Sequence, residues 1–273
     1  MKLDGATVIV TGAARGIGLA VTEACTDRGA KVAMVDVLED DLAKAAITIE
    51  KRGATVLPIV ADVTDAAQVD AMVRRAEAEL GPVDALVNNA ATFSYVGPLW
   101  EAPPETWFRD IRVGLFGGFL CCRAVLGKMV PRERGTIINM VSSGGVGDPH
   151  AYSTSYACTK TALMRLTEGL AREAAPHGIK VFALAPPAVH TEMTQFIMDD
   201  PGGRRWRPEF RERFADGSAF HPASLLGRWT VDLLSGRADA LTGRYFLATR
   251  DFDEVVSQAD RILQDDLMTL RIR

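Results

Sequence analysis

The sequence predicts one α/β domain, in which helices cover both faces of a doubly wound parallel sheet of seven strands. Seven short apolar runs alternate with longer helical patterns along the 273 residues. Such alternation is typical of parallel sheets with right-handed crossovers. The runs are apolar almost throughout, which is typical of strands that are covered on both faces.

The boundaries of these elements follow from the apolar patterns and from glycines. The expected strands are 6–10, 31–35, 55–60, 85–87, 136–141, 180–184 and 244–248. The expected helices are 15–28, 39–52, 65–80, 104–130, 154–176 and 222–235. Glycine adopts the left-handed conformation that often ends a helix. Glycines near helix ends that precede strands are Gly29, Gly53, Gly81, Gly135 and Gly178.

Two segments interrupt the alternation of strands and helices. Residues 188–221 are rich in aromatic and basic groups, and residues 251–273 form a polar tail with a helical pattern. We assign residues 1–250 to one catalytic domain with 188–221 as a substrate lid, and 251–273 to a C-terminal helical extension of the same domain. The aromatic residues of the lid either contact an apolar or ring-bearing substrate, or form the lid core or a subunit interface.

Composition excludes several classes of protein. The net charge of −4 provides no electrostatic footprint for nucleic acid. The four cysteines show no metal-binding spacing, and their scatter is typical of a reducing compartment. No apolar run approaches the roughly 20 residues of a membrane span, and the first residues lack a signal-peptide pattern. We therefore expect a cytoplasmic protein without membrane, nucleic-acid or metal partners.

A glycine-rich turn joins the first expected strand to the first helix. The segment reads Thr11-Gly12-Ala13-Ala14-Arg15-Gly16-Ile17-Gly18. Glycines allow the backbone to approach a pyrophosphate, and the helix N-terminus offers N–H groups and a partial positive charge to it. A tight turn without a ligand is the alternative, but the strand–turn–helix context favours a dinucleotide site.

An acidic residue, Asp36, ends the second expected strand. A carboxylate at this place accepts hydrogen bonds from the adenosine ribose and repels a 2′-phosphate, which favours NAD over NADP. Arg15 is available to a phosphate, so NADP is disfavoured without being excluded. The alternative role for Asp36 is that of an acid near a helix N-terminus.

Polar residues also follow the third and fourth strands, where ligands bind in open α/β sheets. Asp62 and Val63 are expected to contact adenine, although Asp62 is equally suited to cap the turn before Thr64. The fourth strand ends in Asn88 and Asn89. Asn88 is expected either near the cofactor or as a structural tie between strand ends.

A candidate catalytic group lies on the fifth expected helix. Tyr156 and Lys160 are four residues apart and share a helix face, and Ser143 lies 13 residues before Tyr156. A free tyrosine has a pKa near 10, so a pKa near 7 requires roughly 4 kcal/mol of differential stabilisation. Lys160 and a bound nicotinamide, both positive, favour the phenolate. Tyr156 would then act as general base while Ser143 holds the substrate oxygen.

Together these residues resemble the short-chain dehydrogenase/reductase family in its single-domain form. The matching pieces are Thr11–Gly18, Asp36, Asp62-Val63, Asn88–Ala90, Ser143, Tyr156 and Lys160. The resemblance implies a Rossmann-type sheet of order 3-2-1-4-5-6-7 and a homotetramer or homodimer. It also implies that NAD is bound by Gly12, Arg15, Ile17, Gly18, Asp36, Asp62, Val63, Asn89, Tyr156, Lys160, Val189 and Thr191, with the last two near the carboxamide and Lys160 on the ribose.

The sequence departs from the family pattern most seriously at Gly114. The family usually carries an asparagine there, which positions a water in a proton relay from the lysine, and glycine supplies no amide. Two functions therefore stay open. The first is an enzyme that transfers hydride between NAD(H) and a secondary alcohol or ketone, and the second is an NAD-binding protein with impaired or lost catalysis. Smaller departures are Ala91, Pro187 and the tail 251–273.

Overall fold

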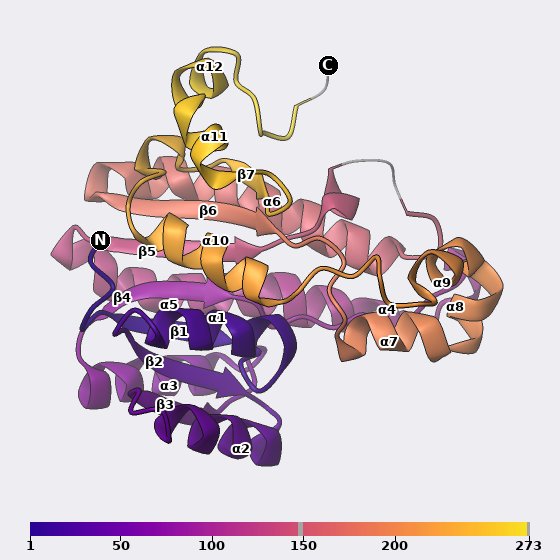
Figure 1. The fold of residues 1–273 in the computed structure, drawn as a ribbon, viewed down its shortest axis with the longest axis horizontal. Coiled ribbons are helices and arrows are strands. Elements are labelled where there is room, and N and C mark those ends of the chain that lie inside the picture. The colour runs from indigo at the N-terminus through magenta and orange to yellow at the C-terminus, as the bar shows by residue number, and fades with distance from the viewer. Residues whose placement is uncertain (147–149, 272–273) are drawn as a thin grey trace.

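A seven-stranded parallel sheet forms the centre of the computed structural model, which describes residues 1–146 and 150–271 (Figure 1). The strand order is β3-β2-β1-β4-β5-β6-β7. The strands are β1 Thr7–Thr11, β2 Lys31–Asp36, β3 Val56–Val60, β4 Val83–Asn88, β5 Gly135–Met140, β6 Ile179–Ala185 and β7 Tyr245–Leu247. All pairs are parallel, which confirms the predicted fold class, the strand number and the strand order.

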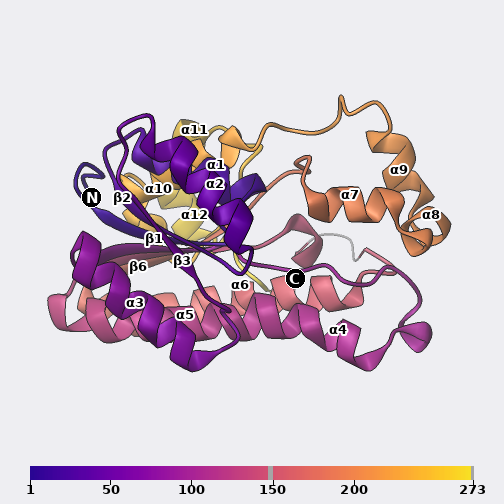
Figure 2. The same cartoon turned by 90° about the horizontal axis from the view of Figure 1, so that it is seen from below.

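Helices cover both faces of this sheet, in two layers (Figure 2). One layer holds α1 Gly16–Thr26, α2 Glu39–Glu50 and α10 Ser224–Leu234. The other holds α3 Ala66–Leu80, α4 Pro104–Ile111, α5 Gly118–Met129 and α6 Thr154–Ala174. Each helix predicted from the sequence is present.

The apolar core lies on both sides of the strands. Within β1, Val8 and Val10 belong to one buried cluster and Ile9 to the other, and all three are fully buried. Successive side chains of a strand point to opposite faces, so a strand covered by helices on both sides needs apolar residues at every position. This burial explains why the strand runs are apolar without alternation.

Four of the five expected helix-ending glycines have the left-handed backbone. Gly29, Gly53, Gly81 and Gly178 have φ angles of +79°, +82°, +105° and +69°. The prediction for Gly135 was wrong, because Gly135 is the first residue of β5 and Glu133 takes the left-handed conformation instead, with φ +51°. The helix before this strand, α5, ends at Met129 and is followed by a short 3₁₀ turn over Val130–Arg132, before Gly135 is reached.

The long helix predicted over 104–130 contains a π-helical segment, Arg112–Gly117, between α4 and α5. Among the described residues, the whole stretch Pro104–Arg132 is long and apolar enough to cross a membrane by length and composition, which corrects the expectation that no segment would qualify. In this fold the stretch covers one face of the sheet (Figure 2). Core helices of soluble proteins meet the same criterion.

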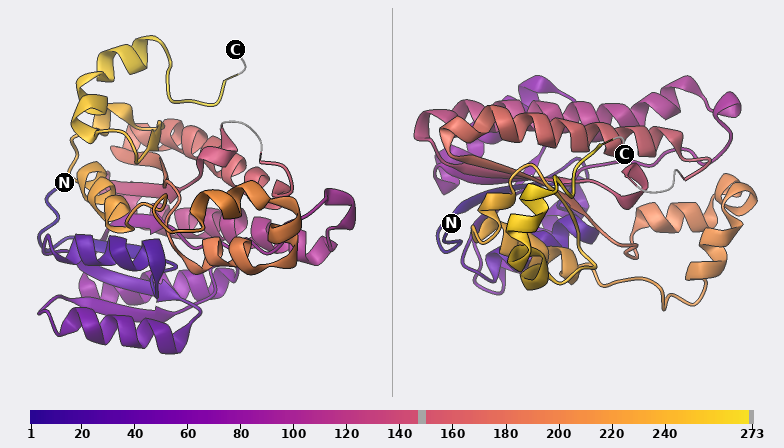
Figure 3. Two further views of the ribbon diagram at one scale, coloured as in Figure 1. Left: turned by 45° about the vertical axis from the view of Figure 1, so that its right-hand side comes forward. Right: turned by 90° about the horizontal axis from the view of Figure 1, so that it is seen from above.

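The expected lid is helical and lies beyond the carboxyl ends of the strands (Figure 3). It contains α7 Glu192–Asp199, α8 Pro201–Trp206 and α9 Pro208–Phe214. Phe214 stacks on Phe220 with ring centroids 4.5 Å apart, and it also contacts Phe210 at 4.6 Å. Part of the aromatic content therefore forms the core of the lid itself.

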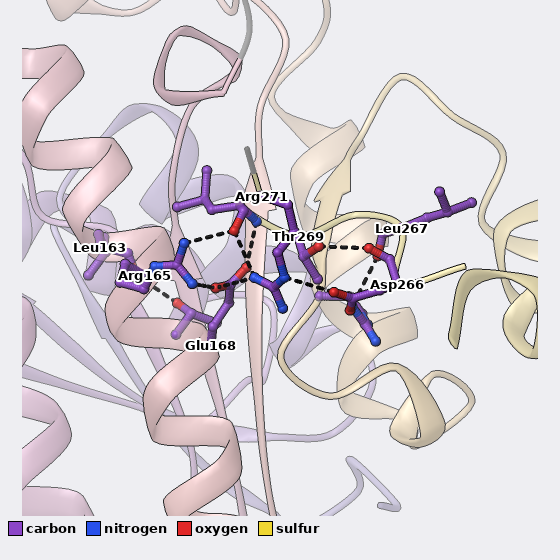
Figure 4. A network of polar contacts seen from close by, with 10 residues as sticks. Leu163, Arg165, Glu168, Asp266, Leu267, Thr269 and Arg271 are labelled. Carbon is purple, nitrogen blue, oxygen red and sulfur yellow. Dashed lines mark hydrogen bonds and ion pairs between the residues drawn. The ribbon is translucent and has the colours of Figure 1, made fainter. Parts of the chain in front are cut away.

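The C-terminal extension folds back onto its own domain. It forms α11 Phe252–Ser257 and α12 Ala259–Gln264, and the backbone carbonyl of Met268 then accepts from Tyr245 N at the edge of β7 (2.9 Å). Glu168 on α6 accepts from Leu270 N (2.6 Å) and pairs with Arg271 (3.2 Å; Figure 4). Ile272 and Arg273, at the end of the predicted extension, lie outside the described residues.

Candidate active site

A cleft with a volume of about 960 Å³ opens at the carboxyl ends of the first strands. Its walls come from the connections after β1, β2, β3 and β4, from α4 and from the start of the lid. The expected cofactor residues that line it are Gly12, Arg15, Ile17, Asp36, Asp62, Val63, Asn89 and Thr191. Gly18, Tyr156, Lys160 and Val189 are not among its lining residues.

The glycine-rich turn has a shape that only glycine permits. Gly12 has φ +65°, and a Cβ there would lie 2.9 Å from Asn89 Nδ2. A Cβ on Gly18 would lie 2.0 Å from the carbonyl oxygen of Gly12, so Gly18 allows α1 to pack under the turn. The first turn of α1 has no acidic residue and no side-chain cap. Its N–H groups therefore suit a dinucleotide pyrophosphate.

Asp36 lines the cleft and also organises the turn around it. Its carboxylate accepts from the backbone N–H groups of Ala14 (3.1 Å), Val37 (2.8 Å) and Leu38 (3.2 Å). Arg15, the basic side chain of the glycine-rich turn, pairs with Glu192 of the lid and lies 3.8 Å from Asp41. Both groups line the cleft, but the basic group already has acidic partners of its own.

The residues after β3 and β4 have mixed roles. Asp62 lines the cleft, and its Oδ1 also accepts from Thr64 N (2.8 Å), as in the capping alternative. Asn88 is a structural tie, because its amide donates to Asn139 Oδ1 of β5 (2.9 Å). Asn89 donates to the carbonyl of Gly12 (3.1 Å) and so fixes the glycine-rich turn.

The structure brings Tyr156 and Lys160 together on α6. The Lys160 ammonium lies 5.6 Å from the centre of the Tyr156 ring. Lys160 is only 3% exposed, and it donates to the carbonyl of Met140, the last residue of β5 (2.8 Å). Tyr156 packs in one apolar cluster with Met193, which lines the cleft. The phenol and the cleft therefore share a wall.

The serine that contacts Tyr156 is Ser142, not the expected Ser143. The Ser142 side chain hydrogen-bonds the phenol, whereas Ser143 is exposed. Ser142 caps the 3₁₀ turn Ser143–Gly145 by accepting from Gly144 N (3.2 Å), and this turn carries Ser143 outward. The spacing to Tyr156 misidentified the serine because a count of residues through a loop does not fix which side chain faces the phenol. The register of β5, which ends two residues before Ser142, is the better signal.

The surroundings of Tyr156 and Lys160 shift the pKa of each group. Burial raises the pKa of Tyr156, the hydrogen bond with Ser142 lowers it, and the Asp110 carboxylate raises it further. Burial also lowers the pKa of Lys160 to about 8. In both groups desolvation disfavours the charged form, whereas the expected lowering of the Tyr156 pKa also requires the positive nicotinamide.

Asp110 is a site residue that sequence reasoning missed. It lies on α4, is only 1% exposed, and accepts from the hydroxyls of Thr92 (2.9 Å) and Ser155 (2.6 Å) and from Ser94 N (3.3 Å). Ser155 immediately precedes Tyr156. No motif marks Asp110, and only its position on the inward face of an amphipathic helix could have drawn attention to it.

At the start of the lid, the structure separates the two expected carboxamide contacts. Thr191 lines the cleft and caps α7 through a reciprocal pair with Thr194. Val189 is 4% exposed and belongs to the main apolar core, and its backbone forms a β-bridge with His221.

Gly114 lies buried in the π-helical segment, close against α6. A Cβ at this position would lie 2.5 Å from Thr159 Cγ2, far inside contact distance. The Thr159 hydroxyl donates to the carbonyl of Ser155 (2.8 Å), which holds its methyl group toward Gly114. Glycine therefore permits the close approach of the two helices.

This fold and site define an oxidoreductase of the Rossmann type, and the comparisons agree. The family model for short chain dehydrogenase matches residues 6–202, and the chain belongs to this short-chain dehydrogenase/reductase family. Galactitol 2-dehydrogenase of Agrobacterium fabrum is 34% identical over 260 residues, which cover 94% of this chain and 96% of the relative. Sorbitol dehydrogenase of Cereibacter sphaeroides is 35% identical with the same coverage. The crystal structure of levodione reductase superposes with a TM-score of 0.81 at 27% identity, covering 89% of this chain and 96% of that one.

Proposed function

We propose that this oxidoreductase transfers a hydride between NAD(H) and a secondary alcohol or ketone, with Tyr156 as general acid and base. The observation that carries the proposal is the contact of Tyr156 with both Lys160 and Ser142, beside the cleft of the glycine-rich turn. NAD, when bound, supplies the hydride acceptor or donor. The side chains of the protein supply the proton transfer and hold the substrate.

Each side chain has a distinct role in this proposal. Tyr156 removes the proton of the alcohol during oxidation and returns it during reduction. Ser142 holds the substrate oxygen, in place of Ser143. The ammonium of Lys160 stabilises the phenolate and contacts the nicotinamide ribose.

The choice of NAD over NADP rests on Asp36. Its carboxylate lines the cleft, where it suits the ribose hydroxyls and repels a 2′-phosphate. Arg15 strengthens the preference because Glu192 and Asp41 already engage its guanidinium.

The remaining parts of the proposal concern substrate, place and assembly. The relatives named for galactitol and sorbitol support a small alcohol as substrate. A cytoplasmic location is supported by the four cysteines, which are all free. We also propose a homotetramer or homodimer, on the family resemblance alone.

Two matched pairs of variants test the proposal. Reduced nicotinamide is followed at its absorbance band with NAD and a panel of secondary alcohols. Tyr156→Phe should abolish turnover, whereas Tyr245→Phe, which removes a hydroxyl on β7, should not. Ser142→Ala should lower kcat/KM about 100-fold, a loss typical of one oxygen-stabilising group, and Ser143→Ala should be nearly silent. Full turnover by Tyr156→Phe refutes the assignment.

The second candidate is an NAD-binding protein with impaired catalysis, and Gly114 favours it. Glycine supplies no amide to a proton relay, and Thr159 fills the space beside it. Calorimetric NAD binding without turnover across the alcohol and ketone panel would support this candidate over the enzyme.

A further inference from the structure

Apolar side chains enclose the ring of Tyr156. Phe93, from the loop after β4, packs with its ring centroid 5.1 Å from that of Tyr156. Phe196 of α7 meets Phe93 edge-to-face, with centroids 6.3 Å apart. Met193 joins the same cluster. Segments far apart in the chain thus form one apolar wall at the reacting phenol, which consists of Phe93, Phe196 and Met193.

Two charged side chains near this wall, Asp110 and Arg207, already have partners. The Asp110 carboxylate accepts from Thr92 and Ser155, as described above. Arg207 donates to the Ser153 hydroxyl (2.9 Å) and pairs with Glu209 (2.7 Å). A ligand with several hydroxyl groups needs a partner for each hydroxyl that it buries, because an unpaired buried hydroxyl costs free energy.

We propose that the carbinol carbon of the substrate carries a neutral, apolar ring or hydrocarbon group, and not the polyol chain for which the relatives are named. The inference rests on the proposed function, because the substrate oxygen must reach the Tyr156 hydroxyl. The substituents on the same carbon then contact Phe93 and Phe196. Apolar surface gains affinity from such contact, whereas the hydroxyls of a polyol lose their water partners there.

The test compares cyclohexanol with galactitol, using NAD and the whole chain. Wild-type protein should show a kcat/KM for cyclohexanol at least about tenfold above that for galactitol. Phe93→Leu and Phe93→Asn form a matched pair, because leucine and asparagine branch at the same carbon but differ in polarity. The leucine variant should keep cyclohexanol turnover within about threefold, and the asparagine variant should lose about tenfold or more.

The outcomes separate this inference from the proposed function. A kcat/KM for galactitol that equals or exceeds that for cyclohexanol overturns the inference and leaves the enzyme assignment intact. Equal cyclohexanol turnover by the two Phe93 variants also overturns it. Absence of turnover with any alcohol or ketone and either nicotinamide overturns the proposed function, and the inference with it.

A second inference rests on a different observation, the buried carboxylate of Asp110. We propose that Asp110 is a positioning residue, which ties the start of α6 to α4 and to the loop of Phe93 and places a negative charge near the Tyr156 phenol. Its three hydrogen bonds connect these segments. Consistent with this placement, its charge raises the pKa of Tyr156.

Lys160 is the positively charged group that the structure places against the Tyr156 ring. The Lys160 ammonium acts on Tyr156 from the same helix, 5.6 Å from the ring centre. Tyr152 packs against the same apolar cluster as Tyr156, whereas Ser142, Phe93 and Met193 carry no titratable group. Removal of the Asp110 charge should therefore favour the phenolate and move alcohol oxidation to lower pH.

The test is the pH profile of kcat/KM for alcohol oxidation. Asp110→Asn can still accept from Ser155 and donate to the Thr92 hydroxyl, so the fold should persist while the charge is lost. At a pH below the wild-type midpoint, its kcat/KM relative to its own plateau should rise about three- to tenfold. The control is Asp84→Asn on β4, which neutralises a buried acid paired with Arg134. This variant should leave the midpoint in place.

A further variant separates the hydrogen bonds of Asp110 from the effect of its negative charge. Ser155→Ala removes one hydrogen bond to Asp110 and keeps the carboxylate, so kcat should fall while the midpoint stays. An unchanged midpoint in Asp110→Asn refutes the electrostatic part of the inference. Wild-type kcat in Ser155→Ala refutes the positioning part.

Discussion

Adding one methyl group at Gly114 tests how closely the π-helical segment approaches α6. The Cβ of Gly114→Ala would lie 2.5 Å from Thr159 Cγ2. Thr159→Ser deletes this methyl group and keeps the hydroxyl that donates to Ser155 (2.8 Å). The two substitutions therefore form a double-mutant cycle. The first creates a steric clash between the new Cβ and Thr159 Cγ2, and the second removes that methyl group and with it the clash.

The magnitudes follow from packing. Overpacking of this kind costs about 1–3 kcal/mol, and alanine gains about 1 kcal/mol over glycine from helix propensity. Gly114→Ala alone should thus lower the free energy of unfolding by up to about 2 kcal/mol. Thr159→Ser alone should cost about 1 kcal/mol, for one buried methyl group. In the serine background, Gly114→Ala should stabilise, which gives a coupling of about 1–3 kcal/mol.

The assay is urea unfolding at one fixed protein concentration, since assembly affects apparent stability. Gly127→Ala on α5 is the control, because a Cβ there meets nothing within 4 Å. It should stabilise by about 1 kcal/mol. Additivity of Gly114→Ala and Thr159→Ser within about 0.5 kcal/mol would refute the reasoning. The same steric clash applies to the asparagine that the family usually carries, so Gly114→Asn requires Thr159→Ser to make room.

Three further predictions concern pH, cofactor choice and the tail. Burial lowers the pKa of Lys160 in the folded protein to about 8, below its ordinary value of 10.5. The folded state therefore loses this proton before the unfolded state does, and the protein gains stability as the pH rises from 8 to 10.5. Unfolding at stepped pH should show wild-type gaining up to about 3 kcal/mol over this window relative to Lys160→Met, and parallel curves would contradict it. Asp36→Ser should raise the NADP-to-NAD ratio of kcat/KM at least about tenfold, and an unchanged ratio would remove the basis for NAD preference. Glu168→Gln should cost about 1 kcal/mol in thermal unfolding at low salt, through Leu270 and Arg271, and less at high salt, so a loss independent of salt would argue against the ion pair.

The sequence was sufficient for features that depend on short-range patterns. Continuous apolar runs indicated buried strands, and Thr11–Gly18 indicated the turn at β1 because its glycines meet steric limits within a few residues. The four-residue spacing placed Tyr156 and Lys160 on one helix face. Asp36 lines the cleft as expected, because it ends a strand and the strand order was predicted correctly.

Features that depend on the path of a loop could not be obtained in this way. Ser142 and Ser143 are adjacent in sequence, and the 3₁₀ turn after β5 decides which one faces the phenol. The aromatic residues of the lid have two different surroundings. Phe214 packs within the lid, whereas Phe196 packs against Phe93 beside Tyr156. No periodicity in the sequence separates these cases.

The amino-acid sequence by itself determined the doubly wound fold, the glycine-rich turn and the Tyr156–Lys160 pair, because each is specified by local geometry. Only the tertiary structure decided that Ser142 meets the phenol, that Asp110 lies buried behind it, and that Gly114 makes room for Thr159. Those contacts join residues from different elements. They depend on how closely helices approach and where loops turn, which are set by the packing of the whole domain.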